Sequence, residues 1–398
     1  MNRQDGPRRP YDVVLFGATG FVGELTAAYL LAHAPRACRL ALAGRSGEKL
    51  ERLRERLAGA DPLRAAEVAL VTADAGDPAA MRELAESAHV VASTVGPYIR
   101  YGEELVAACA DAGTDYLDLT GEPEFVDTMY VRHDPRARAT GARLVHSCGF
   151  DSVPHDLGVY FTVLQLPDGV PLRVDGFVQA RGLISGGTLA SSLTIAGRAR
   201  QALAAARERQ RYEPRPASGR RVRVPAAGPR FSRETGTWAL PLPTIDPTVV
   251  RRSAVALERY GPDFRYRHYA SVKSLPLALA APAGVGALVT AANVPPLRAW
   301  MTKLYPPGRG PDAERRARSW FRVRFVGEGG GRRVFTEVAG GDPGYGETAK
   351  IFAEAALSLA LDDLPETSGQ VTTATAMGDA LTERLRAAGI RFRVAAEC

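Results

Sequence analysis

Hydrophobic and polar positions alternate in a regular order through residues 10–150, where short apolar runs are followed by amphipathic helical patterns. Short apolar runs predict buried strands, and apolar positions at helical spacing predict helices. Strands that alternate with helices are typical of a parallel sheet. We therefore predict a Rossmann-type, doubly wound α/β domain over 10–150, with strands at Tyr11–Phe16, Arg39–Ala43, Val68–Thr72, His89–Thr94, Tyr116–Leu119 and Arg143–His146 and helices that include Phe21–Ala34, Glu48–Leu57 and Gly102–Ala112.

The pattern changes over residues 151–369, where the apolar positions mostly alternate with polar ones. Such alternation predicts half-buried antiparallel strands, which are expected at Arg173–Arg181, Phe264–Val272, Trp320–Val326 and Arg333–Val338. Helical patterns run from Ser185 to Arg209 and over the Ala-rich Lys350–Leu361. We predict a second α+β domain here, which contains a mostly antiparallel sheet and serves substrate binding and dimerisation. We expect residues 370–398 to pack back on the first domain.

The first predicted strand leads into GATGFVG, with glycines at Gly17, Gly20 and Gly23. A strand that turns sharply into a helix leaves the first helical N–H groups free, and these donors form a diphosphate site. The spacing differs from GxGxxG, but the position between strand and helix is the one that dinucleotide binding requires. The predicted phosphate-binding residues are Gly17, Ala18, Thr19, Gly20, Phe21, Val22 and Gly23.

The end of the second predicted strand carries Gly44-Arg45-Ser46 and no acidic residue. NAD-binding chains usually place an Asp or Glu here for the ribose hydroxyl, whereas an Arg suits the 2′-phosphate of NADP. Arg45 offers a planar, permanently charged donor, and Ser46 offers a hydroxyl. We therefore predict NADP(H) as the cofactor; the alternative is that Arg45 is only a solvated loop charge.

Ligands of such sheets lie at the carboxyl ends of the strands. Further cofactor contacts are therefore predicted at Asp74, Ser93, Thr94, Val95, Gly96 and Pro97. Substrate contacts are predicted at Cys148, Gly149, Ser152, Gly187 and Thr188. Ser152 is also a plausible helix cap. Cys148 precedes a predicted helix, where a thiol can become nucleophilic, but hydride transfer needs no nucleophile.

Composition narrows the class of protein. The chain has 398 residues, of which 45% are hydrophobic and 24% charged, as in ordinary soluble proteins. The four cysteines are scattered and no secretory signal opens the sequence, so we expect a cytoplasmic location. The six histidines show no metal-binding spacing, and no metal site is expected.

The net charge of +7 is located in one segment. Residues 207–233 hold nine arginines and two glutamates, a balance that equals the charge of the whole chain. Several prolines and glycines in this segment predict an irregular loop. It is interpreted either as a solubilising loop or as a docking surface for an anionic partner. No aromatic residues are interleaved for base stacking, so nucleic acid is not expected as a partner.

Two stretches of the sequence resemble functional signatures but lack the structural context that those signatures require. Tyr269 and Lys273 match the YxxxK pair of short-chain dehydrogenases, but that pair works on a helix and the surrounding pattern predicts a strand. Residues 274–297 carry no charge, yet prolines and glycines interrupt them, so a single transmembrane helix is not expected. A lipid-touching or acyl-binding flap, a subunit interface and a buried core helix remain open for this apolar segment.

Taken together, the chain resembles the saccharopine dehydrogenase-like NADP-binding oxidoreductases, and within them the trans-acting enoyl reductases of actinobacteria. The resemblance covers nearly the full length and includes GDPGYGETAK (Gly341–Lys350). It is most specific at STVGPYIRY (Ser93–Tyr101), YLDLTGE (Tyr116–Glu122) and CGFDSVPHD (Cys148–Asp156). It implies a Rossmann domain with NADP(H), a second domain over the nicotinamide, and often a homodimer. It also implies reduction of a double bond in a polyketide or lipid intermediate on a carrier protein.

An enoyl reductase needs a donor for the developing enolate and a proton for the α-carbon. Tyr98 is the first candidate catalytic residue, followed by Asp151 and Tyr345. Two alternatives stay open. One is dehydrogenation at a carbon–nitrogen bond, as in saccharopine enzymes. The other is a non-catalytic, nucleotide-binding protein that associates with membranes.

Overall fold

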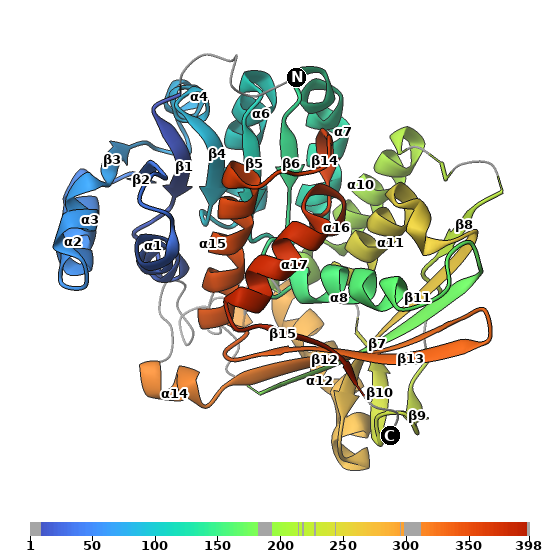
Figure 1. Ribbon diagram of the computed structural model, residues 1–398. Helices are drawn as coiled ribbons and strands as arrows, with labels where there is room; N and C mark the ends of the chain where they lie inside the picture. Colours follow the sequence, from blue (N-terminus) through green and yellow to red (C-terminus); the bar gives the residue numbers. More distant parts are fainter. Residues whose placement is uncertain are drawn as a thin grey trace.

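The computed structural model describes residues 9–181, 193–213, 215–216, 219–226, 228–242, 244–294, 296–297 and 312–395 (Figure 1). Seven parallel strands form sheet A, in the order β14-β6-β5-β4-β1-β2-β3. This order confirms the predicted doubly wound α/β class. The strands are β1 (Tyr11–Phe16), β2 (Leu40–Gly44), β3 (Ala69–Thr72), β4 (Ala88–Ser93), β5 (Asp115–Asp118), β6 (Arg143–Val145) and β14 (Gly369–Val371).

Helices cover both faces of sheet A because successive side chains of its strands point in opposite directions. In β1, Val13 and Leu15 belong to one buried cluster and Val14 and Phe16 to another. The first cluster lies under α1 (Phe21–His33), α2 (Gly47–Ala58) and α15 (Gly346–Leu361), with α3 (Pro62–Glu67) beside it. The second lies under α4 (Pro78–Glu86), α6 (Glu103–Ala112) and α7 (Pro123–Thr140), with the short α5 (Tyr98–Tyr101).

Sheet B has eight strands and is mostly antiparallel. Its order is β15-β13-β12-β7-β11-β10-β9, with β8 also paired to β11. The β7–β11 and β8–β11 pairs are parallel and the other pairs are antiparallel, which confirms the predicted mostly antiparallel sheet. The strands are β7 (Leu172–Arg181), β8 (Arg221–Arg223), β9 (Arg230–Ser232), β10 (Thr237–Pro241), β11 (Asp263–Val272), β12 (Trp320–Gly329), β13 (Arg332–Gly340) and β15 (Arg391–Ala395).

A layer of helices lies between the two sheets and joins them (Figure 1). It contains α8 (Val153–Leu164), α15, α16 (Thr373–Ala376) and α17 (Gly378–Ala387). Leu15 of sheet A and Phe325 of sheet B belong to the same buried cluster. The predicted boundaries at residues 150 and 369 therefore do not separate two independent cores, since α15 packs against α1 and β4 of sheet A.

The C-terminal segment divides between the sheets. β14 extends sheet A by pairing with β6, as expected for a return to the first domain. β15 instead pairs with β13 at the edge of sheet B, so the expectation for residues 370–398 was wrong for this strand. The physical reason is that β13 would otherwise expose a row of unpaired main-chain groups.

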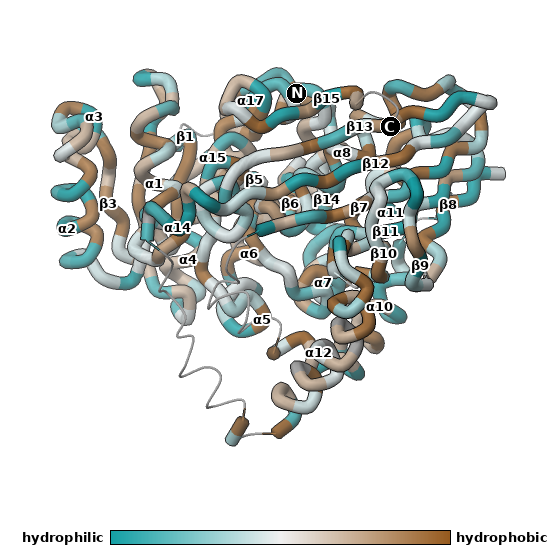
Figure 2. The backbone as a smooth tube through the Cα atoms, turned by 90° about the horizontal axis from the view of Figure 1, so that it is seen from below, coloured by the Kyte–Doolittle hydropathy of each residue, from teal (hydrophilic) through white to brown (hydrophobic). Residues whose placement is uncertain are grey.

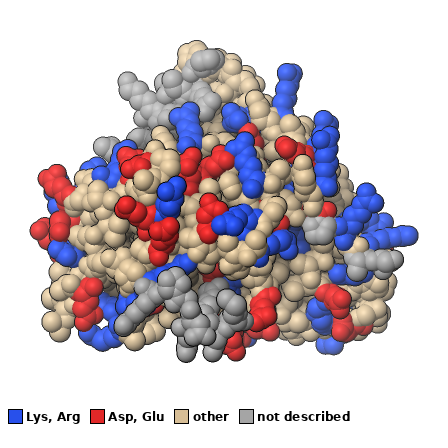
Figure 3. All heavy atoms as spheres, turned by 90° about the horizontal axis from the view of Figure 1, so that it is seen from above, with Lys and Arg blue, Asp and Glu red and all other residues tan. Residues whose placement is uncertain are grey.

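The arginine-rich segment 207–233 is not the irregular loop that the sequence predicts. It begins inside α10 (Ala199–Tyr212) and contains β8 and β9. Arg209 is buried and bonded to Asp127 and Glu213, while the Arg220 guanidinium donates to four main-chain carbonyls. Part of the apparent excess charge therefore serves internal packing. Figure 3 shows acidic and basic side chains interspersed on one face, with basic ones grouped at an edge.

Most of the uncharged segment forms the helix α12 (Leu275–Asn293), which continues through Pro282 in spite of the expected interruption. Leu275, Leu277 and Leu279 are exposed, and Figure 2 shows α12 at the margin of the molecule. Among the described helices, none is both long and apolar enough to cross a bilayer. The remaining elements are α11 (Asp246–Ala256), a 3-10 turn (Glu258–Tyr260) and α14 (Ala313–Ala317).

Candidate functional site: a dinucleotide cleft

The turn between β1 and α1 has the geometry of a phosphate cradle. Gly17 has φ +84°, and a Cβ there would lie 2.6 Å from Thr94 Oγ1. A Cβ on Gly23 would lie 2.2 Å from the Gly17 carbonyl oxygen, so this glycine lets the helix pack on the turn. Gly20 is the N-cap and supplies no side-chain bond. The first N–H groups of α1 are thus left for an anion.

The end of β4 lies directly against this turn. The Thr94 amide donates to Phe16 O at 2.9 Å, and its hydroxyl donates to Gly17 O at 3.0 Å. The Val95 amide lies 3.4 Å from Ser93 Oγ, so the chain bends at once after the strand. The strand order of sheet A reverses between β1 and β4, which is where doubly wound sheets bind ligands. Thr94 and Val95 therefore lie beside the turn, where the predicted cofactor contacts of residues 93–97 would be made.

The ends of β2 and β3 hold the other predicted cofactor residues. Arg45 is exposed and makes no hydrogen bond or ion pair with any described residue, so its guanidinium is available for a phosphate. Ser46 caps α2, because its hydroxyl accepts the Lys49 amide at 3.4 Å. The Asp74 carboxylate accepts the Gly76 amide at 2.9 Å and shapes the turn after β3. These residues fit the adenosine end of NADP.

Comparison with known proteins agrees with this cleft. Residues 13–145 match the saccharopine dehydrogenase NADP binding domain. Proteins named trans-acting enoyl reductase from Mycobacterium tuberculosis and Mycobacterium ulcerans are 36% and 35% identical to the chain, and each alignment covers 96% of this chain and 97% of the relative. The chain belongs to the trans-acting enoyl reductase family. It is an NADP-dependent oxidoreductase, and the predicted cofactor, NADP(H), is confirmed.

One solved structure shows the same architecture. Apo saccharopine dehydrogenase (L-Glu forming) from Saccharomyces cerevisiae superposes with a TM-score of 0.56, and the alignment covers 96% of the reductase and 99% of the yeast chain. The two sequences are only 12% identical, so the likeness concerns the fold.

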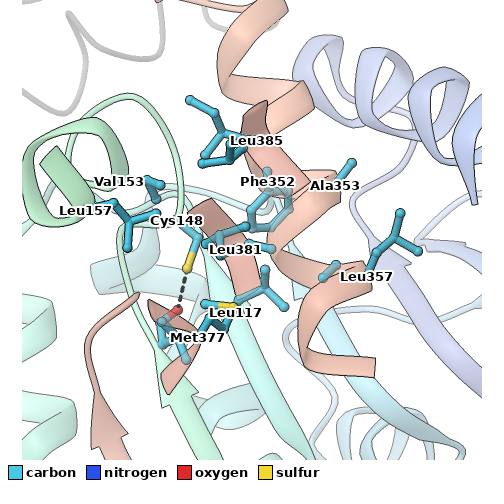
Figure 4. Packing of buried hydrophobic residues seen from close by; sticks show 14 of the residues in the cluster. Leu117, Cys148, Val153, Leu157, Phe352, Ala353, Leu357, Met377, Leu381 and Leu385 are labelled. Carbon is cyan, nitrogen blue, oxygen red and sulfur yellow. Dashed lines mark hydrogen bonds between the residues drawn. The ribbon is translucent and has the colours of Figure 1, made fainter. Parts of the chain in front are cut away.

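Cys148 of the reductase does not reach the cleft. It is fully buried among leucine, valine and phenylalanine side chains, and its Sγ donates to Val145 O at 3.3 Å (Figure 4). Burial raises the pKa of its thiol well above the usual range. The predicted substrate contact at Cys148 was therefore wrong, because the side chain points back into the core under α8 and α15.

The neighbouring substrate candidates have different placements. A Cβ on Gly149 would lie 2.9 Å from Leu119 Cδ2, so this glycine permits close packing of the β6 end against β5. Ser152 starts α8, but its buried hydroxyl makes no cap and lies 3.4 Å from Asp246 Oδ1. Gly187 and Thr188 lie outside the described residues.

Tyr98 has a structural role that conflicts with the predicted catalytic one. Its buried hydroxyl donates to Ser93 O at 3.0 Å and accepts the Leu119 amide at 3.2 Å. Burial, together with the charge of Asp118, raises the pKa of the phenol well above its usual value. Its only proton is thus used to join the ends of β4 and β5. Tyr345 packs edge-on against Phe21, with ring centroids 4.8 Å apart, and lies beside the phosphate turn.

Asp151 is the predicted catalytic residue that is exposed, beyond the carboxyl ends of β5 and β6. Its carboxylate lies beside Gly121, where an added Cβ would be 3.7 Å from Oδ2. The side chain is accessible yet densely surrounded by protein. The resulting desolvation raises the pKa of Asp151 to about 6; the charge of Asp246 adds to the rise and His155 opposes it. A carboxyl group with this pKa can exchange protons near neutral pH.

Two further groups of polar residues lie near the cleft, and sequence reasoning missed the second of them. Glu122 accepts the amides of Tyr98 and Ile99 at 3.2 and 3.0 Å and so fixes the start of α5. Behind the cleft, His155, Asp246 and His268 form a buried cluster. These three residues are far apart in the sequence and follow no spacing rule, so only the fold reveals their proximity.

Proposed function

We propose that the chain transfers hydride from NADPH to the β-carbon of an α,β-unsaturated thioester, acting in trans on a polyketide or lipid intermediate held by a carrier protein. The observation that carries this proposal is the full-length similarity to relatives named trans-acting enoyl reductase. The structural likeness to saccharopine dehydrogenase concerns the fold alone, and no described residue favours carbon–nitrogen chemistry over this reading.

The chain's own residues orient the reactants and move a proton. NADPH, when bound, supplies the hydride. The turn at Gly17–Gly23 and the guanidinium of Arg45 hold its phosphates, and the bend at residues 93–97 borders the crevice. Hydride addition leaves an enolate on the thioester, and the α-carbon then needs a proton. We assign this proton to the Asp151 carboxyl group, because it is accessible at the carboxyl end of the strands.

The substrate is proposed to be apolar. The exposed leucines of α12 offer a hydrophobic surface of the kind that contacts acyl chains. We propose the acyl or polyketide chain of the carrier-bound substrate as its partner. Peripheral membrane contact, a homodimer and a cytoplasmic location stay predictions.

A direct test uses NADPH deuterated at C4 and a series of enoyl thioesters, both free and on a phosphopantetheinylated carrier protein. The proposal expects NADPH oxidation, a saturated product and deuterium at the β-carbon, measured by absorbance and mass spectrometry. Tight NADPH binding without turnover of any unsaturated thioester would support the non-catalytic alternative. Turnover of an imine or an amino acid instead would support carbon–nitrogen chemistry.

A further inference from the structure

Three buried polar side chains meet behind the cleft. His155 comes from the first turn of α8, Asp246 from the first residue of α11, and His268 from the middle of β11. Each residue is at most 4% exposed. One nitrogen or oxygen atom from each residue lies within 4.8 Å of the corresponding atoms of the other two. The cluster therefore connects sheet B to α8, the helix that follows the carboxyl end of β6 in sheet A.

The orientation of the side chains is the informative feature. His155 Nδ1 lies 3.1 Å from Asp246 Oδ1, and His268 Nε2 lies 3.5 Å from Asp246 Oδ2. Both nitrogens interact with the carboxylate, but neither is well aligned for a hydrogen bond to a described residue, and His155 Nε2 also has no partner among them. When a ring nitrogen and a carboxylate oxygen lie this close without the angle of a hydrogen bond, both can instead direct lone pairs at one atom between them.

A metal ion is a group that would occupy such a point. Two ligands of a tetrahedral Zn²⁺, each roughly 2.0–2.1 Å from the metal, lie about 3.3 Å apart. The two imidazole–carboxylate separations, 3.1 Å to Asp246 Oδ1 and 3.5 Å to Asp246 Oδ2, fall on either side of this value. A buried imidazole nitrogen without a partner costs about 1–3 kcal/mol. Two such nitrogens beside one carboxylate therefore lower the stability of the fold when no ion is bound. A bound ion would give both nitrogens a partner.

The surroundings hold these ligands in place. Tyr266 Oη lies 2.7 Å from His268 Nδ1, which fixes the ring and leaves Nε2 directed at the cluster. The hydroxyl of Ser152 lies 3.4 Å from Asp246 Oδ1, and the Thr244 hydroxyl donates to Oδ2. Metal-binding histidines and carboxylates commonly have such outer hydrogen bonds, which orient them.

We propose that His155, Asp246 and His268 bind a divalent transition-metal ion. Two imidazoles and one carboxylate are the donor set of several zinc sites, and Fe²⁺ uses the same set. We commit to Zn²⁺ because both imidazole–carboxylate separations are close to the ligand spacing of a tetrahedral zinc site. The ion ties α8 and α11 to β11 and so fixes the second half of the chain relative to the cleft. This proposal is independent of the proposed reductase reaction, and it departs from the expectation of no metal site.

The wild-type protein alone provides the first test. Full-length protein without a histidine tag is purified from zinc-supplemented cells, and its metal content is measured by mass spectrometry. We expect close to one zinc per chain, a lower melting temperature after removal of zinc by a chelator, and recovery on adding Zn²⁺. Cobalt-substituted protein should show the visible absorption of four-coordinate Co²⁺. Metal content at background, with no visible absorption and no effect of chelator, would overturn the proposal.

Variants then locate the ion. His155→Gln and His268→Gln should each lose the zinc and the response of the melting temperature to chelator. His33→Gln is the matched control, because His33 is an exposed histidine on α1 that stacks on Tyr29. Zinc retained by the first two variants at the level of this control would place the metal elsewhere and contradict the proposal. If these variants do not fold, the cobalt spectrum of the wild type decides.

Discussion

The hydroxyl of Thr94 donates a hydrogen bond to the carbonyl oxygen of Gly17, at 3.0 Å, across the point where the strand order of sheet A reverses. The two residues are remote in sequence, yet this bond joins the end of β4 to the turn that is predicted to hold the phosphates of the cofactor. Gly17 can approach so closely only because it lacks a side chain: a Cβ would lie 2.6 Å from Thr94 Oγ1 and 2.7 Å from Val95 Cγ2.

Gly17→Ala should therefore weaken NADPH binding. The added methyl group pushes the turn away from Thr94, and positive φ costs a non-glycine residue about 1–2 kcal/mol. We expect NADPH affinity to fall by about tenfold or more, the equivalent of about 1.4 kcal/mol, as measured by fluorescence titration. Gly141→Ala is the control, because Gly141 has φ +82° but no atom within 4 Å of its added Cβ. It should lose stability only; equal affinity losses in both variants would contradict the explanation.

Arg45→Ala should remove the preference for NADPH over NADH. A charged hydrogen bond contributes about 1.5–3 kcal/mol, so NADPH affinity should fall roughly tenfold to a hundredfold while NADH affinity stays the same. Titration with both cofactors measures the difference. Arg52→Ala is the matched control, since Arg52 is an exposed arginine of α2 paired with Glu48. A parallel loss of both cofactors in Arg45→Ala would show that Arg45 does not read the 2′-phosphate.

Tyr98→Phe should lower stability and spare turnover. The variant leaves Ser93 O without its donor and the Leu119 amide without its acceptor, at a cost of about 1–3 kcal/mol in unfolding free energy. Denaturant unfolding measures this loss, and kcat for an identified substrate should stay within a few-fold of wild type. Tyr101→Phe, at an exposed tyrosine of α5, should change neither quantity. A collapse of kcat without loss of stability would restore Tyr98 as a catalytic residue.

The sequence predicted features that depend on neighbouring residues better than features that depend on contacts between distant segments. The strand Tyr11–Phe16 was predicted with both ends correct because its apolar run is bounded by a glycine turn. The parallel β7–β11 pair was not predicted, because strand pairing depends on contacts between remote segments. Helix α7 was also not predicted, because its apolar periodicity is weak and it contains Pro135.

The site shows the same division. Gly17 and Arg45 lie in local motifs whose residue types already specify a phosphate ligand. Cys148 was misplaced, because a position next to a helix start does not reveal whether the side chain points into the core. The His155–Asp246–His268 cluster could not be read from spacing, because each member comes from a different element.

The ion pair between Asp12 of β1 and Arg39 should make the stability of the fold depend on pH in the acidic range. Although partial burial raises the pKa of Asp12, the hydrogen bonds and charge of Arg39 outweigh this effect and lower it below the usual value. A lowered folded-state pKa means that the stabilisation is present above the unfolded pKa and is lost as the pH falls through the folded pKa. Asp12→Asn should therefore cost about 1 kcal/mol at neutral pH and nothing in strong acid.

Urea unfolding across the pH range measures this dependence. Glu48→Gln is the control, because its pair with Arg52 is exposed on both sides. It should unfold like the wild type at every pH. A constant difference between Asp12→Asn and wild type down to strong acid would mean that the lost interaction is not ionic.

Asp151→Asn tests the assigned proton donor. An amide keeps the size of the side chain but has no acidic proton, and a positioned acid contributes about 10²–10⁴-fold to such steps. We expect kcat to fall by at least about a hundredfold, whereas NADPH affinity stays the same because the phosphate turn is untouched. Stopped-flow measurement of NADPH oxidation, with mass spectrometry of the product, gives both quantities. Asp168→Asn, at an exposed aspartate before β7, serves as the control. If Asp151→Asn turns over at the wild-type rate while it folds and binds NADPH normally, the α-carbon receives its proton from another group.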